Sequence, residues 1–391
     1  MTGFAWHKAA RLADDTGLAR DASFQPVIPE RPARAALATA LAGQGRAFRI
    51  GGAGPAPEPG QVPMFETLTG GSTGTPRRIR RSQASWTASF AVNASRFGIA
   101  PGTGTAVLGH LGHSLALYGA LESLGLGATL HLLGELRPDR QRQALARGAV
   151  DLIYATPTQL RLLTEAAGPV LPARHVLVGG SKLDPALRRA VAGMVPDAGI
   201  HEFYGAAEAS FITLAGPDAP EASVGRAYPG VTLAIRAPDG GDLAEGQVGE
   251  IWVQSPYLFA GYAGTPGSAR WQDGWLSVGE HGRMQSGFLY LSGRAGRMVK
   301  IADRAVYPEQ VEAFLQAQPG VARAAVLSRP DALRGQHLVA LVQGAAADAD
   351  LLAALRGEFG PLVAPKAILR PDAWPMLPSG KTDLARLARL L

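Results

Sequence analysis

A run of glycines, hydroxyl side chains and arginines is the part of this sequence best suited to chemistry. It reads TLTGGSTGTPRRIRRS over residues 67–82. Glycines leave backbone N–H groups accessible, and hydroxyl and guanidinium groups add further donors, so such a loop is suited to holding phosphate. A hydrolase nucleophile turn and a plain flexible loop are the two competing interpretations.

The hydrolase interpretation rests on a Gly-x-Ser-x-Gly pattern, which residues 70–74 satisfy. In hydrolases with this pattern the serine is followed directly by a helix. Here Pro76 and the basic segment 77–82 follow, which indicates a turn and then an extended segment. The sequence therefore favours a phosphate-binding loop.

The composition limits the classes of partner and site. The 391 residues are 47% hydrophobic and 18% charged, which is enough to bury a large core in two or more domains. The absence of cysteine excludes disulfides, thiolate metal sites and a cysteine nucleophile. The net charge of +6 favours an anionic partner, such as a nucleotide, coenzyme A or an acidic carrier protein. No dense Lys/Arg tract with interleaved aromatics is present, so no nucleic-acid partner is expected.

Targeting and membrane signals are weak in this sequence. The first residues lack the apolar segment of a signal peptide. The most apolar stretch, residues 104–132, contains Glu122, three histidines and six glycines. We therefore expect a cytoplasmic protein without a membrane span.

Strands and helices alternate after residue 82. Residues 104–111 and 128–134 read as strands, and residues 115–127 between them as a helix. This rhythm predicts an α/β fold with a largely parallel, helix-covered sheet. Residues 1–60 read as irregular, because prolines are frequent there.

The pattern changes twice further along the chain. Short strands with Gly/Asp turns over about 222–292 predict a small β-barrel-like part. Residues 295–391 predict a small, mobile α+β domain, with a hinge at Gly293–Gly296. We therefore expect a large N-terminal domain over 1–294 and a lid domain over 295–391.

Seven motifs between residues 69 and 383 stand in the same order as in the adenylate-forming superfamily, which the chain resembles. That superfamily comprises acyl-CoA synthetases, adenylation domains and luciferases. The motifs are TGGSTGTPR, GHLGHSLALYG, LVGGSKL, EFYGAAEAS, VGEIWVQSPYLFAGY, the block from DGWLSVGEHGRM to RAVYPEQVE, and LPSGKTD. The resemblance implies that ATP, with Mg²⁺, activates a carboxylic acid to acyl-AMP and releases pyrophosphate, after which a thiol takes the acyl group. Positioning and electrostatic stabilisation would supply most of the rate.

The resemblance assigns the opening loop to the β- and γ-phosphates of ATP. The loop residues are Thr69, Gly70, Gly71, Ser72, Thr73, Gly74 and Arg77, with arginine at 77 where the family usually has lysine. The arginines that follow, up to residue 81, are expected to help neutralise the phosphates. Thr73 and Glu208 would hold Mg²⁺, which prefers oxygen ligands.

The resemblance also assigns a nucleoside site. Tyr204 would stack on adenine, Glu280 would hold the ribose hydroxyls in place of the family's aspartate, and Arg294 would contact ribose and phosphate. The remaining members of this nucleotide site are Gly180, Gly205 and Ala207, and Ala207 replaces a usual hydroxyl residue.

A lysine and an acyl pocket complete the site that the resemblance implies. Lys381 would swing in to contact the reacting carboxylate and the α-phosphate. His113, or less favourably His110, would guard the acyl pocket. Small residues would form the pocket floor and leave room for a flat or elongated acyl group: Gly179, Gly180 and Ala206.

Several positions depart from the family pattern. The phosphate loop usually lies more than a hundred residues into the chain, so a large part of the usual first subdomain is expected to be missing. Gly296 stands at the hinge and still permits domain rotation. Ala302 and Asp303 replace two glycines of the loop that lines the pantetheine tunnel, which makes adenylation better supported than thioester formation.

The sequence leaves more than one candidate for the acyl acceptor and for the acid substrate. The phosphopantetheine thiol of an acidic acyl carrier protein is favoured, with free CoA as the alternative, since both are anionic. Small residues after Tyr204 favour an aryl acid such as a hydroxybenzoate. A non-catalytic nucleotide-binding protein and an α/β-hydrolase are further alternatives, and ATP–pyrophosphate exchange separates both from a ligase.

Overall fold

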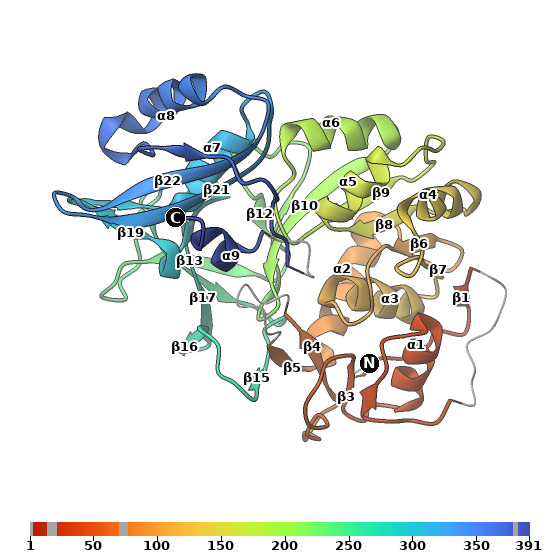
Figure 1. Ribbon diagram of the computed structural model, residues 1–391. Coiled ribbons are helices and arrows are strands. Elements are labelled where there is room, and N and C mark those ends of the chain that lie inside the picture. Colours follow the sequence, from red (N-terminus) through yellow and green to blue (C-terminus); the bar gives the residue numbers. More distant parts are fainter. Residues whose placement is uncertain (1–2, 14–21, 70–76, 378–381) are drawn as a thin grey trace.

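The computed structural model describes residues 3–13, 22–69, 77–377 and 382–391 (Figure 1). Some residues assigned above therefore lie outside the described residues: Gly70, Gly71, Ser72, Thr73, Gly74 and Lys381. Their roles stay predictions.

The largest sheet has eight strands in the order β1-β7-β6-β8-β9-β10-β11-β12. The first six in that order run parallel, and the last two pair antiparallel. The strands are β1 (Arg11–Leu12), β6 (Gly104–Val107), β7 (Thr129–Leu132), β8 (Leu152–Ala155), β9 (His175–Val178), β10 (Gly199–Ala206), β11 (Ser210–Ala215) and β12 (Arg226–Ala227). The parallel sheet predicted from the alternating pattern is thus confirmed.

Helices cover both faces of this sheet (Figure 1). One layer contains α2 (Ala84–Phe97) and α3 (Ser114–Leu126), and the other contains α4 (Pro138–Arg147), α5 (Pro157–Glu165) and α6 (Pro185–Met194). Side chains alternate along a strand, so Tyr154 of β8 packs toward the α2–α3 layer while Ile153 packs toward α4–α6. Both faces are buried, which explains why the strands read as continuous apolar runs.

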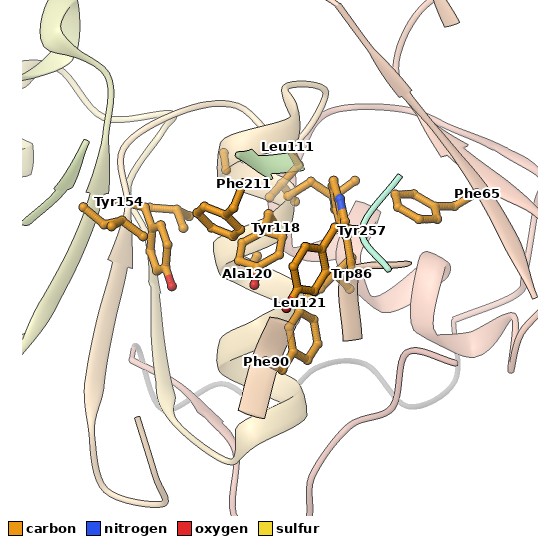
Figure 2. Close-up of a cluster of buried hydrophobic side chains, with 14 of the residues drawn as sticks. Phe65, Trp86, Phe90, Leu111, Tyr118, Ala120, Leu121, Tyr154, Phe211 and Tyr257 are labelled. Carbon is orange, nitrogen blue, oxygen red and sulfur yellow. The ribbon is translucent and has the colours of Figure 1, made fainter. Parts of the chain in front are cut away.

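The core beneath α2 and α3 is rich in aromatic rings. Figure 2 shows Trp86, Phe90, Tyr118 and Phe211 gathered there. The ring of Tyr118 packs edge-on against those of Trp86 and Phe211, with ring centroids 5.3 Å and 5.1 Å apart.

In the ranges that the structure describes, no helix combines the length and apolar character needed to cross a bilayer.

A second sheet contains the two strands that precede and follow the predicted phosphate-binding loop in the chain. Its five strands, in the order β15-β5-β4-β3-β2, are β2 (Val27–Ile28), β3 (Phe48–Ile50), β4 (Met64–Leu68), β5 (Arg78–Ser82) and β15 (Gly261–Ala263). The loop joins β4 to β5, which pair antiparallel. The expectation that residues 1–60 are irregular is wrong, because the alanine-rich segment forms α1 (Ala33–Ala42) and buries residues 36–40.

An antiparallel sheet follows in the chain. It joins β13 (Thr232–Arg236), β14 (Gly249–Gln254), β17 (Trp275–Gln285) and β16 (Arg270–Gln272), and β18 (Phe288–Arg294) pairs with β17. These strands account for the β-rich part expected over about 222–292.

The C-terminal part has a core of its own. Val311, Leu315, Val326 and Leu355 pack together in it. Its elements are η1 (Ala295–Arg297), β19 (Val299–Ile301), β20 (Arg304–Val306), α7 (Pro308–Gln316), β21 (Val321–Asp331), β22 (Gly335–Gly344), α8 (Asp348–Val363), β23 (Ile368–Leu369) and α9 (Leu384–Ala388). The mixed α/β class with a small α+β C-terminal part is as predicted, whereas the exact domain boundary at residue 294 stays a prediction.

The β19–β20 hairpin turns through an alanine in a left-handed conformation. Ala302 has φ of +51°, and its N–H donates to the Arg334 carbonyl over 3.0 Å. A left-handed backbone costs an L-residue with a Cβ about 1 kcal/mol. We expect Ala302→Gly to raise the free energy of unfolding of this region by about 1 kcal/mol in urea titrations. Ala302→Val should lower it, and equal stability of the three proteins would contradict the strain.

Candidate active site

Three side chains assigned to the nucleoside meet between the parallel and antiparallel sheets. Tyr204 lies in β10, while Glu280 and Arg294 face each other across β17 and β18. The Tyr204 hydroxyl donates to one oxygen of Glu280, and Arg294 Nε lies 3.5 Å from the other. Burial, together with the negative charge of Glu280, raises the pKa of Tyr204, so its hydroxyl stays protonated and keeps donating. The ring of Tyr204 is thereby fixed at the carboxyl end of β10.

Glu208 lies on the turn that follows β10. Its Oε1 accepts from the Tyr262 hydroxyl over 2.9 Å, and Tyr262 belongs to β15. Burial raises the pKa of Tyr262 and Glu208 adds to the rise, whereas Arg77 opposes it. Glu208 and Arg77, which carry opposite charges, therefore both act on the Tyr262 hydroxyl.

The two ends of the phosphate loop are tied together. The Thr69 N–H donates to the Arg77 carbonyl over 2.9 Å, and the Arg77 N–H donates to Thr69 Oγ1 over 3.0 Å. Leu68 also forms a parallel bridge with His113, the residue before α3. The loop therefore leaves the sheet next to the residue predicted to guard the acyl pocket.

The two candidate histidines differ in their surroundings. His110 Nε2 lies 3.2 Å from the Arg31 guanidinium. Partial burial lowers the pKa of His113, an effect that Glu30 opposes and His110 reinforces. His113 is thus a mostly neutral ring at neutral pH, beside the base of the loop.

The arginines after the loop do not all face the site, which corrects one expectation. Arg78 donates to the Pro55 carbonyl over 3.1 Å and lies 3.5 Å from Glu66. Arg80 donates to the carbonyls of residues 58 and 59. Because side chains alternate along β5, Arg81 points the opposite way, into the core. The predicted role at the phosphates is therefore wrong for the buried Arg81, and for Arg78 and Arg80 it stays a prediction.

Arg81 instead holds the turn that carries Glu208. It is fully buried, and its guanidinium donates to the carbonyls of Ala207 and Tyr257 and to Ser210 Oγ. Burial lowers the pKa of Arg81 to about 9, which Glu208 partly counteracts, so it is still charged at neutral pH. The motifs gave no sign of this role, although Arg81 shares the buried face of β5 with Ile79.

The predicted acyl-pocket floor is partly filled by the chain itself. A side-chain carbon on Gly179 would lie 2.1 Å from Cζ of Phe203, so the Phe203 ring occupies the room that this glycine leaves. The expectation of open space above Gly179 is therefore wrong. Gly180 has φ of +102° and is exposed, and Gly205 lies at a bulge where a Cβ would clash with the Ser210 carbonyl. Ala206 is half-buried beside them.

The donor set around Glu208 fits Mg²⁺ held jointly with phosphate. Mg²⁺ is usually bound by one or two carboxylates together with substrate phosphate oxygens. Among residues 3–13, 22–69, 77–377 and 382–391, no three His, Asp or Glu side chains gather as a metal site of their own. The single carboxylate of Glu208, which shares the neighbourhood of Tyr262 with Arg77, is consistent with such a shared site.

Two family models match most of the chain. The model described as "AMP-binding enzyme" matches residues 13–263, and "AMP-binding enzyme C-terminal domain" matches residues 310–381. An uncharacterized acyl–CoA ligase, YhfT of Bacillus subtilis, is 32% identical over 336 residues, 84% of this chain and 69% of that protein. Indoleacetate–CoA ligase of Aromatoleum aromaticum is 28% identical over 82% of this chain and 66% of its own length. The chain thus spans about two thirds of these relatives.

Solved structures show the same architecture. Amide bond synthetase McbA from Marinactinospora thermotolerans superimposes with a TM-score of 0.79 at 25% identity, covering 95% of this chain and 91% of McbA. The o-succinylbenzoate CoA synthetase MenE of Bacillus subtilis, in complex with its acyl-adenylate intermediate, gives a TM-score of 0.73 at 24% identity. That match covers 83% of this chain and 68% of MenE.

Proposed function

The chain belongs to the AMP-binding enzyme family and is an ATP-dependent, AMP-forming ligase, and from this premise we propose its substrate and acceptor. It activates an aryl acid such as a hydroxybenzoate to acyl-AMP and transfers the acyl group to the phosphopantetheine thiol of an acyl carrier protein. The observation that carries the site assignment is the meeting of Tyr204, Glu280 and Arg294, which come from distant parts of the chain.

The geometry suggests how the nucleotide would be held. Tyr204, fixed by its hydrogen bond to Glu280, offers a rigid ring for adenine. Glu280 supplies acceptors for ribose hydroxyls, and Arg294 supplies donors nearby. Glu208 would hold Mg²⁺, which supplies positive charge at the phosphates. Arg77, one of the two tied ends of the loop, would add positive charge at the phosphates.

Charge that develops on the reacting groups would be stabilised by Arg77 and by Lys381. Nucleophilic attack of the carboxylate on the α-phosphate forms the new C–O–P link while the bond to pyrophosphate breaks. Lys381 would contact the carboxylate and α-phosphate from the C-terminal part, and His113 would guard the entry for the thiol. These two roles follow from the family motifs.

The acceptor has two alternatives besides a carrier protein. Free CoA is supported by the two relatives named above as CoA ligases. An amine acceptor, giving an amide, is supported by the match to McbA, which spans 91% of that synthetase. The net charge of +6 suits an acidic carrier protein.

ATP–pyrophosphate exchange over a panel of aryl and alkyl carboxylic acids tests the first half-reaction. We expect exchange with aryl acids to exceed exchange with alkyl acids. The best acid is then incubated with holo-carrier protein, CoA or a simple amine, and products are identified by mass. Acyl-carrier protein is the expected product, acyl-CoA or an amide would overturn the acceptor, and no exchange with any acid would overturn the function.

A further inference from the structure

A cavity of about 570 Å³ opens at the amino-terminal ends of β6, β8 and β9, where α2 ends. Its wall includes Arg96, Thr103, Asp151, Arg174 and His175. The candidate active site lies at the opposite edge of the sheet, where the same strands end. Along β10 the two edges are separated by residues 199–204, roughly 17 Å of extended strand. The cavity is therefore separate from the nucleotide site.

Two guanidinium groups face this cavity. Arg174 Nε lies 3.4 Å from Asp151 Oδ1, and Asp151 Oδ2 accepts from the Gly104 N–H over 2.9 Å. The carboxylate is thus fixed by the backbone and orients Arg174. In the described part of the chain, no carboxylate lies within ion-pair distance of Arg96. One of the two cations is therefore left without a counter-charge.

A smaller cavity of about 220 Å³ adjoins through Arg96, which lines both. It adds Arg226, whose guanidinium lies 3.8 Å from the centre of the Phe288 ring and donates to the Ser286 carbonyl. Asp218 also lines this second cavity. Together the two cavities are lined by three guanidinium groups and two carboxylates, which leaves an excess of positive charge.

One member of a histidine pair, His175, lines the cavity. His175 Nδ1 lies 3.2 Å from His201 Nε2, and the ring of Phe97 packs edge-on against both. Burial lowers the pKa of His175, and Arg174 adds to this; the pKa of His201 is lowered to about 4 by burial, His175 and Arg96. Both rings are therefore neutral at neutral pH; Arg174 and Arg96 disfavour their protonation, whereas Asp151 favours that of His175.

We propose that this cavity binds the phosphate group of a small phosphorylated molecule, independently of the ligase activity. Guanidinium forks match phosphate oxygens, and the volume is in the range of small-molecule sites. The C-terminal end of α2 contributes about half a negative charge, which the two arginines outweigh. The phosphate would lie between Arg96 and Arg174, with the Thr103 hydroxyl nearby.

Titration with inorganic phosphate tests the proposal, with saturating AMP present so that the nucleotide site is filled. Binding is followed by calorimetry and by the ring NMR signals of His175 and His201. We expect both signals to shift on binding. Each of Arg96→Gln and Arg174→Gln should weaken the phosphate affinity about tenfold, because each removes one charged partner.

Arg140→Gln is the matched control, since Arg140 is an exposed arginine beside Asp139 on α4 and lies on the other face of the sheet. It should bind phosphate as the wild type does. Unchanged phosphate affinity in the double variant that combines Arg96→Gln with Arg174→Gln would overturn the proposal. So would the absence of a shift of either histidine signal at millimolar phosphate. AMP should bind the wild type and the double variant equally, and a selective loss in the double variant would contradict the separation of the two sites. Failure of the wild type to bind AMP would instead count against the proposed ligase function.

Discussion

Replacing Arg81 with methionine is expected to lower the rate of acyl-adenylate formation by about 100-fold and the free energy of unfolding by about 3 kcal/mol. The guanidinium donates to the buried carbonyl of Tyr257 and to the partly buried carbonyl of Ala207, which would lose these donors. Leaving buried acceptors unsatisfied costs roughly 1–3 kcal/mol each. Glu208 follows Ala207 directly, so any shift of this carbonyl moves the proposed magnesium ligand.

The backbone conformation of Ser210 is a second sign that Arg81 positions the turn that carries Glu208. It is a non-glycine residue with φ of +57°, and it is held there by Arg81 and by the Trp86 indole N–H, 2.9 Å from its hydroxyl. Such a conformation persists only where surrounding contacts enforce it. Loss of the guanidinium should therefore let the turn over residues 206–210 relax.

Arg49→Met separates positioning from stability, since Arg49 is another fully buried arginine and pairs with Glu66 over 2.7 Å. It should cost a similar free energy of unfolding while changing the adenylation rate by less than about tenfold. Rates are measured by ATP–pyrophosphate exchange, and stabilities by urea titration. A folded Arg81→Met protein with the wild-type rate would show that Glu208 does not depend on this arginine.

Local pattern was sufficient for the parallel sheet but not for the N-terminal region. Residues 104–111 and 115–127 were predicted as strand and helix, and β6 and α3 occupy these places. Residues 33–42 form a helix whose polar and apolar faces differ little, so its sequence shows no clear helical periodicity. Prolines before and after it also favoured an irregular segment. The pairing of β2 with β3 joins segments 20 residues apart, which no local periodicity reports.

The candidate site could be predicted only through the motif order. Tyr204 and Glu280 are 76 residues apart, and their hydrogen bond depends on two different sheets meeting. Two features needed the three-dimensional structure. Side chains alternate between the two faces of β5, so that of Arg81 points into the core. The Phe203 ring fills the space above Gly179. Both features arise from packing between segments that are distant in sequence. Local composition and motif spacing therefore do not predict them.

A buried carboxylic acid links protein stability to pH. Glu122 of α3 is fully buried, and its Oε1 accepts from Asn93 and from Tyr118, each over 2.8 Å. The Tyr154 hydroxyl donates to its other oxygen. Burial raises the pKa of Glu122 to about 7, although these three hydrogen bonds favour the ionised form. Figure 2 shows Tyr118 and Tyr154 within the same buried cluster.

The sign of the effect follows from the raised pKa. Below pH 4.5 the carboxyl group is protonated in both the folded and the unfolded chain, and it has no effect on pH dependence. As the pH rises toward 7, the unfolded chain loses this proton while the folded protein keeps it, so the folded state loses stability. Above pH 7 the carboxyl group ionises in the folded protein too. The loss in free energy of unfolding then reaches its full value of roughly 3 kcal/mol.

Glu122→Gln should remove this dependence, because the amide keeps the shape of the side chain and does not titrate. Its oxygen still accepts from Asn93 and Tyr118, and its amino group donates to the Tyr154 hydroxyl. We therefore expect the stability of the variant relative to the wild type to rise by roughly 3 kcal/mol between pH 4.5 and pH 8 in urea titrations.

Tyr228→Phe is the control within the same network, since it removes only the hydrogen bond from Tyr228 to Asn93 Oδ1, 2.6 Å long. It should lower the free energy of unfolding by about 1 kcal/mol at every pH, because the lost hydroxyl is protonated throughout this range. Wild type and Glu122→Gln curves that run parallel from pH 4.5 to pH 8 would show that Glu122 keeps an ordinary pKa in the folded protein.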